Sequence, residues 1–337
     1  MWPFARNPER DARSTEAALV PAAFGTDPVL RSGCAAVREG GVAAGLTLLA
    51  EEREDPEVRV HRAEALGRAA VGRLDGVAAL AEGSADQADA LLWLGYTLLA
   101  AAVSGPVGTA AGRADRKALA AALTEARLPL EAAARLRPDD PAPWAALQTV
   151  AMGLGADRGE KDRLWGEVVA RAPHLLPAHM TRVRTLSPAR GGSTEEMFAV
   201  AGAAADTAPE GSPLPSVLAL AHAEHLRAER ARIVAEGGSD YIAGLGLGRL
   251  TGESVRELFD AARAWATAGA EHERDVQAHH LFGWAFYRVE ATEAAAWHLG
   301  AAGRYYCDLP WSFFGSARAG VAEAMSRLGV VPGGGRA

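Results

Sequence analysis

Prolines recur at a nearly constant spacing at the ends of expected helices. Pro138, Pro173 and Pro209 are 35 and 36 residues apart, within "AARLRPDDP", "VVARAPHLLP" and "AADTAPEGSPLP". A period near 34 residues is typical of helix-turn-helix repeats, which bury their apolar faces only by stacking on their neighbours. The spacing therefore predicts an α-solenoid built from helix pairs.

Apolar residues between these prolines follow the helical period. Segments such as "ADALLWLGYTLLAAA" and "SVRELFDAARAWATAGA" place them at i, i+3, i+4 and i+7. Asp140 before Pro141 fits an N-cap and a first helical residue, while Ser193 and Ser254 each precede a glutamate with the spacing of a capping box. Since no stretch shows convincing β-branched alternation, the prediction is an all-α protein with no β-sheet.

The segment from residue 278 to residue 311 resembles a tetratricopeptide repeat. That repeat places an aromatic residue, a Leu-Gly pair, a further aromatic residue, Ala, Phe, Ala and Pro at fixed offsets. The positions that match it, in order, are Phe282, Gly283, Phe286, Ala295, Leu299 and Ala302. His279 replaces the first aromatic residue and the closing proline comes late, at Pro310. Upstream, Leu94 and Gly95 form a second Leu-Gly pair.

The glycine of each pair stands among large apolar residues, in a segment that otherwise reads as a helix. A glycine inside a helix costs about 1 kcal/mol relative to alanine. Close packing between the two helices of a repeat would offset that cost, because a missing side chain lets them approach. Gly283 and Gly95 are therefore predicted inside helices at helix-helix contacts, and a helix end is the alternative for each.

Most of the chain is similar to an actinobacterial family of tetratricopeptide-like proteins that is known only as a domain of unknown function. The order of "LRPDDPAPW", "LWGEVVARAPHLLPAHM", "GGSTEEMFAVA", "LALAHAEH", "LFGWAF" and "LPWSFF" carries this resemblance. Ala189 and Arg190 replace the Lys-Trp that usually precedes the glycine at position 191. The resemblance implies the solenoid fold and no activity. The expected organisation is one continuous solenoid: an irregular helical region at 1–90, repeats at 91–225, and a connecting helix with further repeats at 226–337.

Charge and composition exclude several classes of partner. The net charge is −7, and no run of basic residues is interleaved with aromatic ones, so nucleic acid is not an expected partner. The amino terminus has no apolar core of signal-peptide length, and no apolar run reaches the ~20 residues of a membrane span. A cytoplasmic protein that does not bind membranes is the prediction. Cys34 and Cys307 lack metal-site or redox spacing and are expected to be reduced and buried.

No motif for catalysis or for a cofactor is convincing. His222 and His225 lie one helical turn apart but lack a third metal ligand, and Asp275 with His279 is read as a helix-surface hydrogen bond. The glycines of "AGLGLGRLTGES" follow no strand and depart from the dinucleotide pattern. The serines occupy cap or turn positions. We therefore predict no enzyme activity, no cofactor and no metal, although scattered polar residues that converge in the fold would escape this reading.

The remaining functional surface is the concave groove of the solenoid. In tetratricopeptide arrays the first helix of each pair lines this groove, and in the last repeat that helix carries His280, Trp284, Tyr287 and Arg288. Aromatic residues and arginine are the types that anchor interfaces, although helical spacing of apolar residues also fits a core. The prediction is a protein-interaction module whose groove binds a peptide or helix of an unidentified partner. The alternative is a small-molecule sensor with its ligand inside a closed superhelix. Self-association is a further expectation, because a solenoid with a weak end cap exposes apolar surface.

Overall fold

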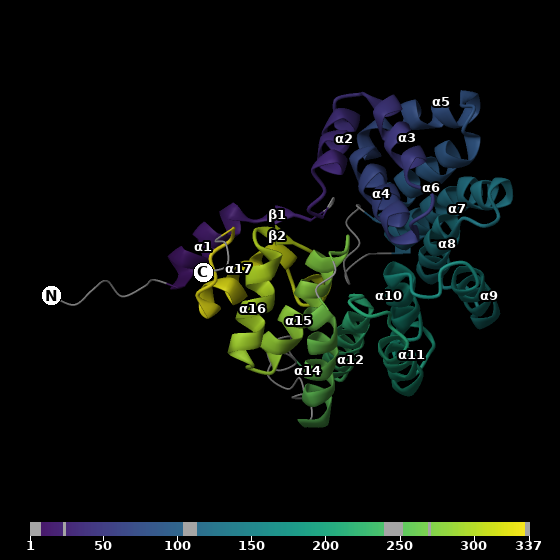
Figure 1. The fold of residues 1–337 in the computed structure, drawn as a ribbon. Coiled ribbons are helices and arrows are strands. Elements are labelled where there is room, and N and C mark those ends of the chain that lie inside the picture. Colours follow the sequence, from purple (N-terminus) through teal and green to yellow (C-terminus); the bar gives the residue numbers. More distant parts are fainter. Residues whose placement is uncertain (1–7, 23–24, 104–112, 239–251, 269–270, 334–337) are drawn as a thin grey trace. The chain divides into compact units, whose positions relative to one another are not determined.

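The computed structural model of the chain describes residues 8–22, 25–103, 113–238, 252–268 and 271–333. Figure 1 shows that helices dominate this part of the chain, which contains 16 α-helices. The predicted all-α class is confirmed. Within these ranges, no helix is both long and apolar enough to cross a membrane.

The chain divides into two compact units. Unit 1 contains residues 1–25 and 186–337, and unit 2 contains residues 26–185. This division differs from the predicted regions, whose boundaries at 90/91 and 225/226 lie inside helix α6 (Gln87–Val103) and helix α12 (Val217–Ala235). The charged residues that follow position 225 continue α12 without a break, so a change of composition along the chain does not by itself mark a boundary between units.

Unit 2 is a set of consecutive helices that pack on their neighbours. Pairs in contact include α2 with α3, α6 with α7, α7 with α8, and α8 with α9. Its core contains the fully buried side chains of Leu66, Trp93 and Leu130. Besides α6, the helices are α2 (Pro28–Arg38), α3 (Val42–Glu51), α4 (Pro56–Ala69), η1 (Val71–Arg73), α5 (Leu74–Gly83), α7 (Arg113–Leu136), α8 (Pro141–Leu154), α9 (Arg158–Val169) and α10 (Leu176–Thr185).

Unit 1 combines the amino-terminal segment with the carboxy-terminal half of the chain. Contacts join α15 to α16, α11 to α12 and α12 to α15. Besides α12, its helices are α1 (Pro8–Ala18), η2 (Pro188–Arg190), α11 (Thr194–Asp206), η3 (Leu214–Ser216), α14 (Gly252–Ala268), α15 (Asp275–Arg288), α16 (Thr292–Ala302), η4 (Trp311–Phe313) and α17 (Ala317–Leu328). The predicted connecting helix corresponds to the second half of α12.

Several predicted helix ends are confirmed. The Asp140 side chain accepts a hydrogen bond from Ala142 N (2.9 Å) at the start of α8, and the Ser193 side chain accepts one from Glu196 N (3.1 Å) at the start of α11. The three periodic prolines each come shortly after the end of α7, α9 or α11. The predicted cap at Ser254 is wrong, because α14 is already helical at Gly252. Capping-box spacing also occurs by chance within a helix, so it does not by itself locate the start.

A short parallel pairing contradicts the prediction of no β-sheet. Strand β1 (Val20–Pro21) pairs with β2 (Tyr305–Tyr306), and Val20 N donates to Arg304 O (3.0 Å). Figure 1 shows this pair beside α1, which packs on α17. The extended residues after α1 need acceptors for their backbone N–H groups, and the β2 segment supplies them. A two-residue strand is too short to produce an alternation signal in the sequence.

The predicted glycine contacts are confirmed. Gly283 lies inside α15, where an added Cβ would meet the Leu299 side chain of α16 at 2.9 Å. Gly95 lies inside α6, where an added Cβ would meet the Leu130 side chain of α7 at 2.5 Å and Leu130 N at 3.4 Å. A leucine occupies the space of the missing side chain in both pairs. These two contacts fix how closely each helix pair packs.

A buried ionic network joins several helices of unit 2. The guanidinium of Arg59 in α4, 1% exposed, donates to Asp89 Oδ1 (2.7 Å) in α6 and to Asp140 Oδ2 (2.8 Å) at the start of α8. Asp89 also pairs with Arg53 and Arg137. Burial alone would raise the pKa of Asp89, but the hydrogen bonds from Arg137, Arg59 and Arg53 outweigh it and lower that pKa. Asp89 is therefore ionised and connects elements far apart in sequence.

Candidate functional site

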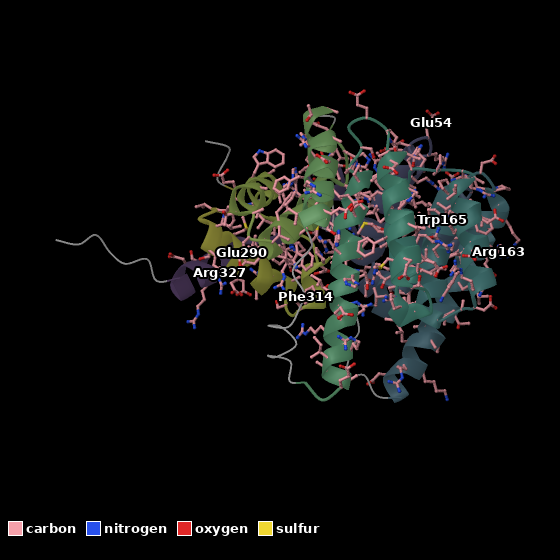
Figure 2. All side chains as sticks on the ribbon, turned by 90° about the horizontal axis from the view of Figure 1, so that it is seen from below. Glu54, Arg163, Trp165, Glu290, Phe314 and Arg327 are labelled. Atoms are coloured by element: carbon pink, nitrogen blue, oxygen red, sulfur yellow. The ribbon has the colours of Figure 1, made fainter. Side chains whose placement is uncertain are left out.

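A pocket of about 490 Å³ lies on unit 1, lined by α12, α15, η4 and α17 and the residues beside them. We call it the arginine-aromatic pocket. Two of its residues, Phe314 and Arg327, are labelled in Figure 2. The lining consists of Arg230, Trp284, Tyr287, Arg288, Trp311, Phe314, Gly315, Ser316, Ala319, Gly320, Glu323 and Arg327.

The periodicity of α15 places three residues on the pocket. Trp284, Tyr287 and Arg288 are spaced i, i+3 and i+4, so they share one side of the helix. Gly283 packs instead against α16. The helix thus uses one face to form the helix pair and another face to line the pocket.

Aromatic rings form the wall of the pocket. The rings of Trp284 and Phe314 stack with their centroids 5.4 Å apart and a 16° angle between their planes. Tyr287 and Trp311 are in tilted contact at 6.3 Å. Trp284 is only 2% exposed, whereas Phe314 and Tyr287 are half-buried. The surface available to a ligand is therefore mainly Phe314 and Tyr287, with the two indoles packed behind them.

A small residue brings α17 against this wall. An added Cβ at Gly320 would lie 3.3 Å from Cε3 of Trp311, so a larger side chain would press on the indole. The side chain of Ser316 accepts a hydrogen bond from Ala319 N (3.3 Å) and caps the start of α17. Ala319 is exposed on the first turn. The α17 side of the pocket is therefore lined by small residues, which leave room for a ligand.

The lining carries more positive than negative charge, although the whole chain has a net charge of −7. Arg327 forms an ion pair with Glu323 (2.7 Å), and its side chain also forms a hydrogen bond with the side chain of Tyr287. The guanidinium of Arg230 lies 5.9 Å from the centroid of the Phe314 ring. Among the described residues, Arg288 has no hydrogen-bonded or ion-paired acid. Arg288 is exposed overall, although partial desolvation lowers its pKa, an effect that the nearby Tyr287 partly offsets.

His280, the fourth predicted site residue, does not line the pocket. It is 1% exposed, its Nε2 lies 2.8 Å from Tyr305 O, and its Nδ1 accepts a hydrogen bond from Trp311 Nε1 (3.2 Å). Burial lowers the pKa of His280 to about 4, so it is neutral near pH 7. The expected exposure on a groove is corrected here, because β2 and η4 cover this position. His280 supports the pocket wall through Trp311.

Sequence reasoning missed the pocket residues outside α15. Arg230 belongs to the charged part of α12, Phe314 is the last residue of "LPWSFF", and Ala319 and Glu323 follow that segment. The three aromatic residues after the proline of that segment were a usable signal, since large aromatic side chains in a loop need a surface to pack on. No local pattern shows that α12 and α17 meet at α15.

The other histidines of unit 1 lie in apolar surroundings. His298 is in contact with Trp265, Phe282 and Phe286, and its Nδ1 lies 3.0 Å from His279 Nδ1. Burial and the neighbouring His279 lower the pKa of His298 to about 3. Asp275 was expected to form a hydrogen bond with His279 on the helix surface. In the structure, Asp275 Oδ2 accepts a hydrogen bond from His272 N (2.9 Å). This cluster is part of the core.

The other residues considered for metal, redox or cofactor sites give no further candidate site within the described residues. Burial, followed by the charge of His225, lowers the pKa of His222 to about 4. Within the described ranges, no group of three or more His, Cys, Asp or Glu side chains is placed to hold a metal ion. Neither cysteine forms a disulfide; Cys34 is buried as predicted, whereas Cys307 is only half-buried. Gly244, Gly246 and Gly248 of the glycine-rich segment lie outside the described residues.

Comparisons with models of known protein families, with curated proteins and with solved structures find no match to this chain. The resemblance to tetratricopeptide repeats therefore remains a prediction from the residues that carry it.

Proposed function

We propose that this chain is a non-catalytic protein-interaction module, and that its arginine-aromatic pocket binds a peptide or helix of a partner protein. The observation that carries the proposal is the lining of one pocket by Tyr287, Arg288 and Phe314. Tyrosine and arginine are enriched among the residues that dominate binding energy at interfaces. The aromatic wall is held by stacking and hydrogen bonds, so little side-chain entropy would be lost on binding.

The polar groups of the lining support a binding role over a catalytic one. The carboxylate of Glu323 pairs with Arg327, and the hydroxyl of Ser316 caps α17. Both groups thus already have structural roles in the helix that forms this side of the pocket. The same proposal includes the stacking of tetratricopeptide-like helix pairs as a solenoid, which is supported by the neighbour-on-neighbour packing of helices within each unit.

A blocking substitution tests this role without removing the packed aromatic residues. Ala319→Trp places a large side chain in the pocket from an exposed position, and Ala264→Trp makes the same change at an exposed position of α14 that is not part of the lining. In pull-downs from the host lysate, we expect the wild type and Ala264→Trp to capture the same partner and Ala319→Trp to lose it. Capture that is equal for all three would place binding elsewhere and contradict the proposal.

A small-molecule ligand is the second candidate. The pocket volume of about 490 Å³ falls within the range of about 300–1,000 Å³ that is typical of small-molecule sites. Native mass spectrometry of the purified protein distinguishes the two. A bound small molecule that is lost in Ala319→Trp would favour this candidate over a peptide.

A further inference from the structure

The charge of the arginine-aromatic pocket gives information about the ligand, provided that the proposed function holds. Glu323 already pairs with Arg327, so these two charges largely cancel. Arg288 has no such acid among the described residues, and its pKa is lowered by desolvation. Arg288 is exposed and lines the pocket, and a guanidinium that has no paired acid forms charge-assisted hydrogen bonds with a carboxylate that reaches it. The pocket therefore favours a ligand that brings a negative charge to Arg288.

One carboxylate satisfies this geometry better than a phosphate does. A planar carboxylate accepts two parallel hydrogen bonds from a single guanidinium. Recognition of phosphorylated residues generally uses a cluster of arginines. Of the other two arginines of the lining, Arg327 is engaged by Glu323 and Tyr287, and the guanidinium of Arg230 lies over the Phe314 ring, 5.9 Å from its centroid. The carboxylate of Glu323 would also repel a dianion. A single negative charge therefore fits the lining.

The exposed part of the aromatic wall defines a second requirement. Phe314 and Tyr287 are half-buried and border the same pocket as Arg288. An apolar or aromatic side chain placed on them would remove its own surface and theirs from water. Because the whole pocket measures about 490 Å³, the charged group and the apolar group of a ligand must be close together.

We infer that the partner segment presents an Asp or Glu side chain to Arg288, within a few residues of an aromatic or large aliphatic side chain that packs on Phe314 and Tyr287. This assigns a chemistry to the proposed partner: a short acidic-hydrophobic segment inside a chain. The recognised carboxylate is that of a side chain, so a free chain terminus is not required.

Peptide display tests this assignment. The probe is a library of random peptides fused to a coat protein through their carboxy termini, so that a selected carboxylate must come from a side chain. Wild type, Arg288→Leu, Arg288→Gln, Arg256→Leu and Ala319→Trp are the baits. Arg256 is the matched control, since it is exposed on α14, lies outside the lining and loses the same charge. Circular dichroism verifies that each bait is folded.

We expect wild type and Arg256→Leu to enrich peptides with Asp or Glu near Phe, Tyr, Trp or Leu. Both Arg288 variants should lose this preference. A selected peptide made with an amidated terminus should bind about tenfold or more weakly when its acid is replaced by the amide, and the Arg288 variants should not distinguish the two forms. Enrichment of peptides without acids, which Ala319→Trp still abolishes, would overturn the inference and leave the proposed function standing. No enrichment by wild type, or enrichment that Ala319→Trp leaves intact, would contradict the proposed function itself.

Discussion

Glycines at helix contacts show what single residues contribute to this fold. The positions of Gly283 and Gly95 follow from the sequence, because a glycine within an apolar helical segment needs a packing reason. Gly67 in α4, which follows Leu66 in the region expected to be irregular, shows the same effect. An added Cβ there would lie 2.8 Å from the backbone C and O atoms of Tyr96. Sequence reasoning misses such a position because the glycine's partner is a distant backbone segment.

Gly67→Ala should lower the free energy of unfolding by about 1–3 kcal/mol, since the backbone of α6 would have to shift. Gly166→Ala in α9 is the matched control, because no atom lies within 4 Å of the added methyl group. That control should raise stability by about 0.5–1 kcal/mol. Urea unfolding of both variants measures the difference. A Gly67→Ala protein as stable as the control would show that the two helices do not pack this closely.

The buried histidines make unit 1 sensitive to acid. The folded-state pKa of His298 is about 3, below its unfolded value of 6.5, so its stabilising contribution is complete above pH 6.5. That contribution decreases as the pH falls from about 6.5 toward about 3, by about 2 kcal/mol at about pH 5. His298→Phe should therefore flatten the dependence of unfolding free energy on pH between about 7 and 5. An unchanged slope would mean that His298 is not neutral and buried in the folded state.

At the scale of elements, helix existence is more predictable than the contacts between helices. Periodicity and prolines locate α8, α9 and α11 and their ends, because those signals are local. The β1–β2 pair and the Arg59 network join residues far apart in the chain, and a single sequence carries no record of such contacts. The one cap predicted wrongly, at Ser254, failed because its spacing was considered without the residues before it.

The ionic network of unit 2 gives a prediction about element packing. Asp89→Asn should destabilise the protein by about 3–5 kcal/mol, because Arg59 would keep its buried charge while losing a charged acceptor. The lowered pKa of Asp89 also makes the stability of the folded protein depend on pH. The ionised carboxylate stabilises the folded state above the unfolded pKa of 3.8, and this contribution is lost as the pH falls below that value. Thermal unfolding of Asp89→Asn and of Glu51→Gln, at a more exposed position, provides the comparison. Equal melting temperatures would contradict the role of the network.

At the scale of the whole molecule, the amino-terminal segment belongs to the carboxy-terminal half of the chain. Besides the β1–β2 pair, Arg318 Nε in α17 donates to Glu16 O (2.8 Å). The sequence assigned this segment to an amino-terminal region, since only proximity along the chain was available. The pocket residues on α15 could be predicted, because they share one helix. Those on α12 and α17 could not, because they come near α15 only in the folded chain.

Removal of residues 1–22 should loosen α17 and leave unit 2 unchanged. The truncated chain loses the backbone bonds to β2 and the packing of α1 on α17. Hydrogen exchange should accelerate in residues 305–328, while the amides of α4 and α6 keep their protection. Unchanged exchange in residues 305–328 would show that the segment does not stabilise unit 1.

Photo-crosslinking from within the pocket tests the central claim, binding of a partner segment, most directly. Benzoylphenylalanine in place of Ala319 reports on what occupies the arginine-aromatic pocket, and the same residue in place of Ala264 reports on the surface of α14 outside the lining. After irradiation in the cells that make the protein, the account predicts a crosslink to one partner at position 319 only, mapped by mass spectrometry to an acidic-hydrophobic segment. The absence of a protein crosslink at position 319, or the same crosslinks from both positions, would contradict it.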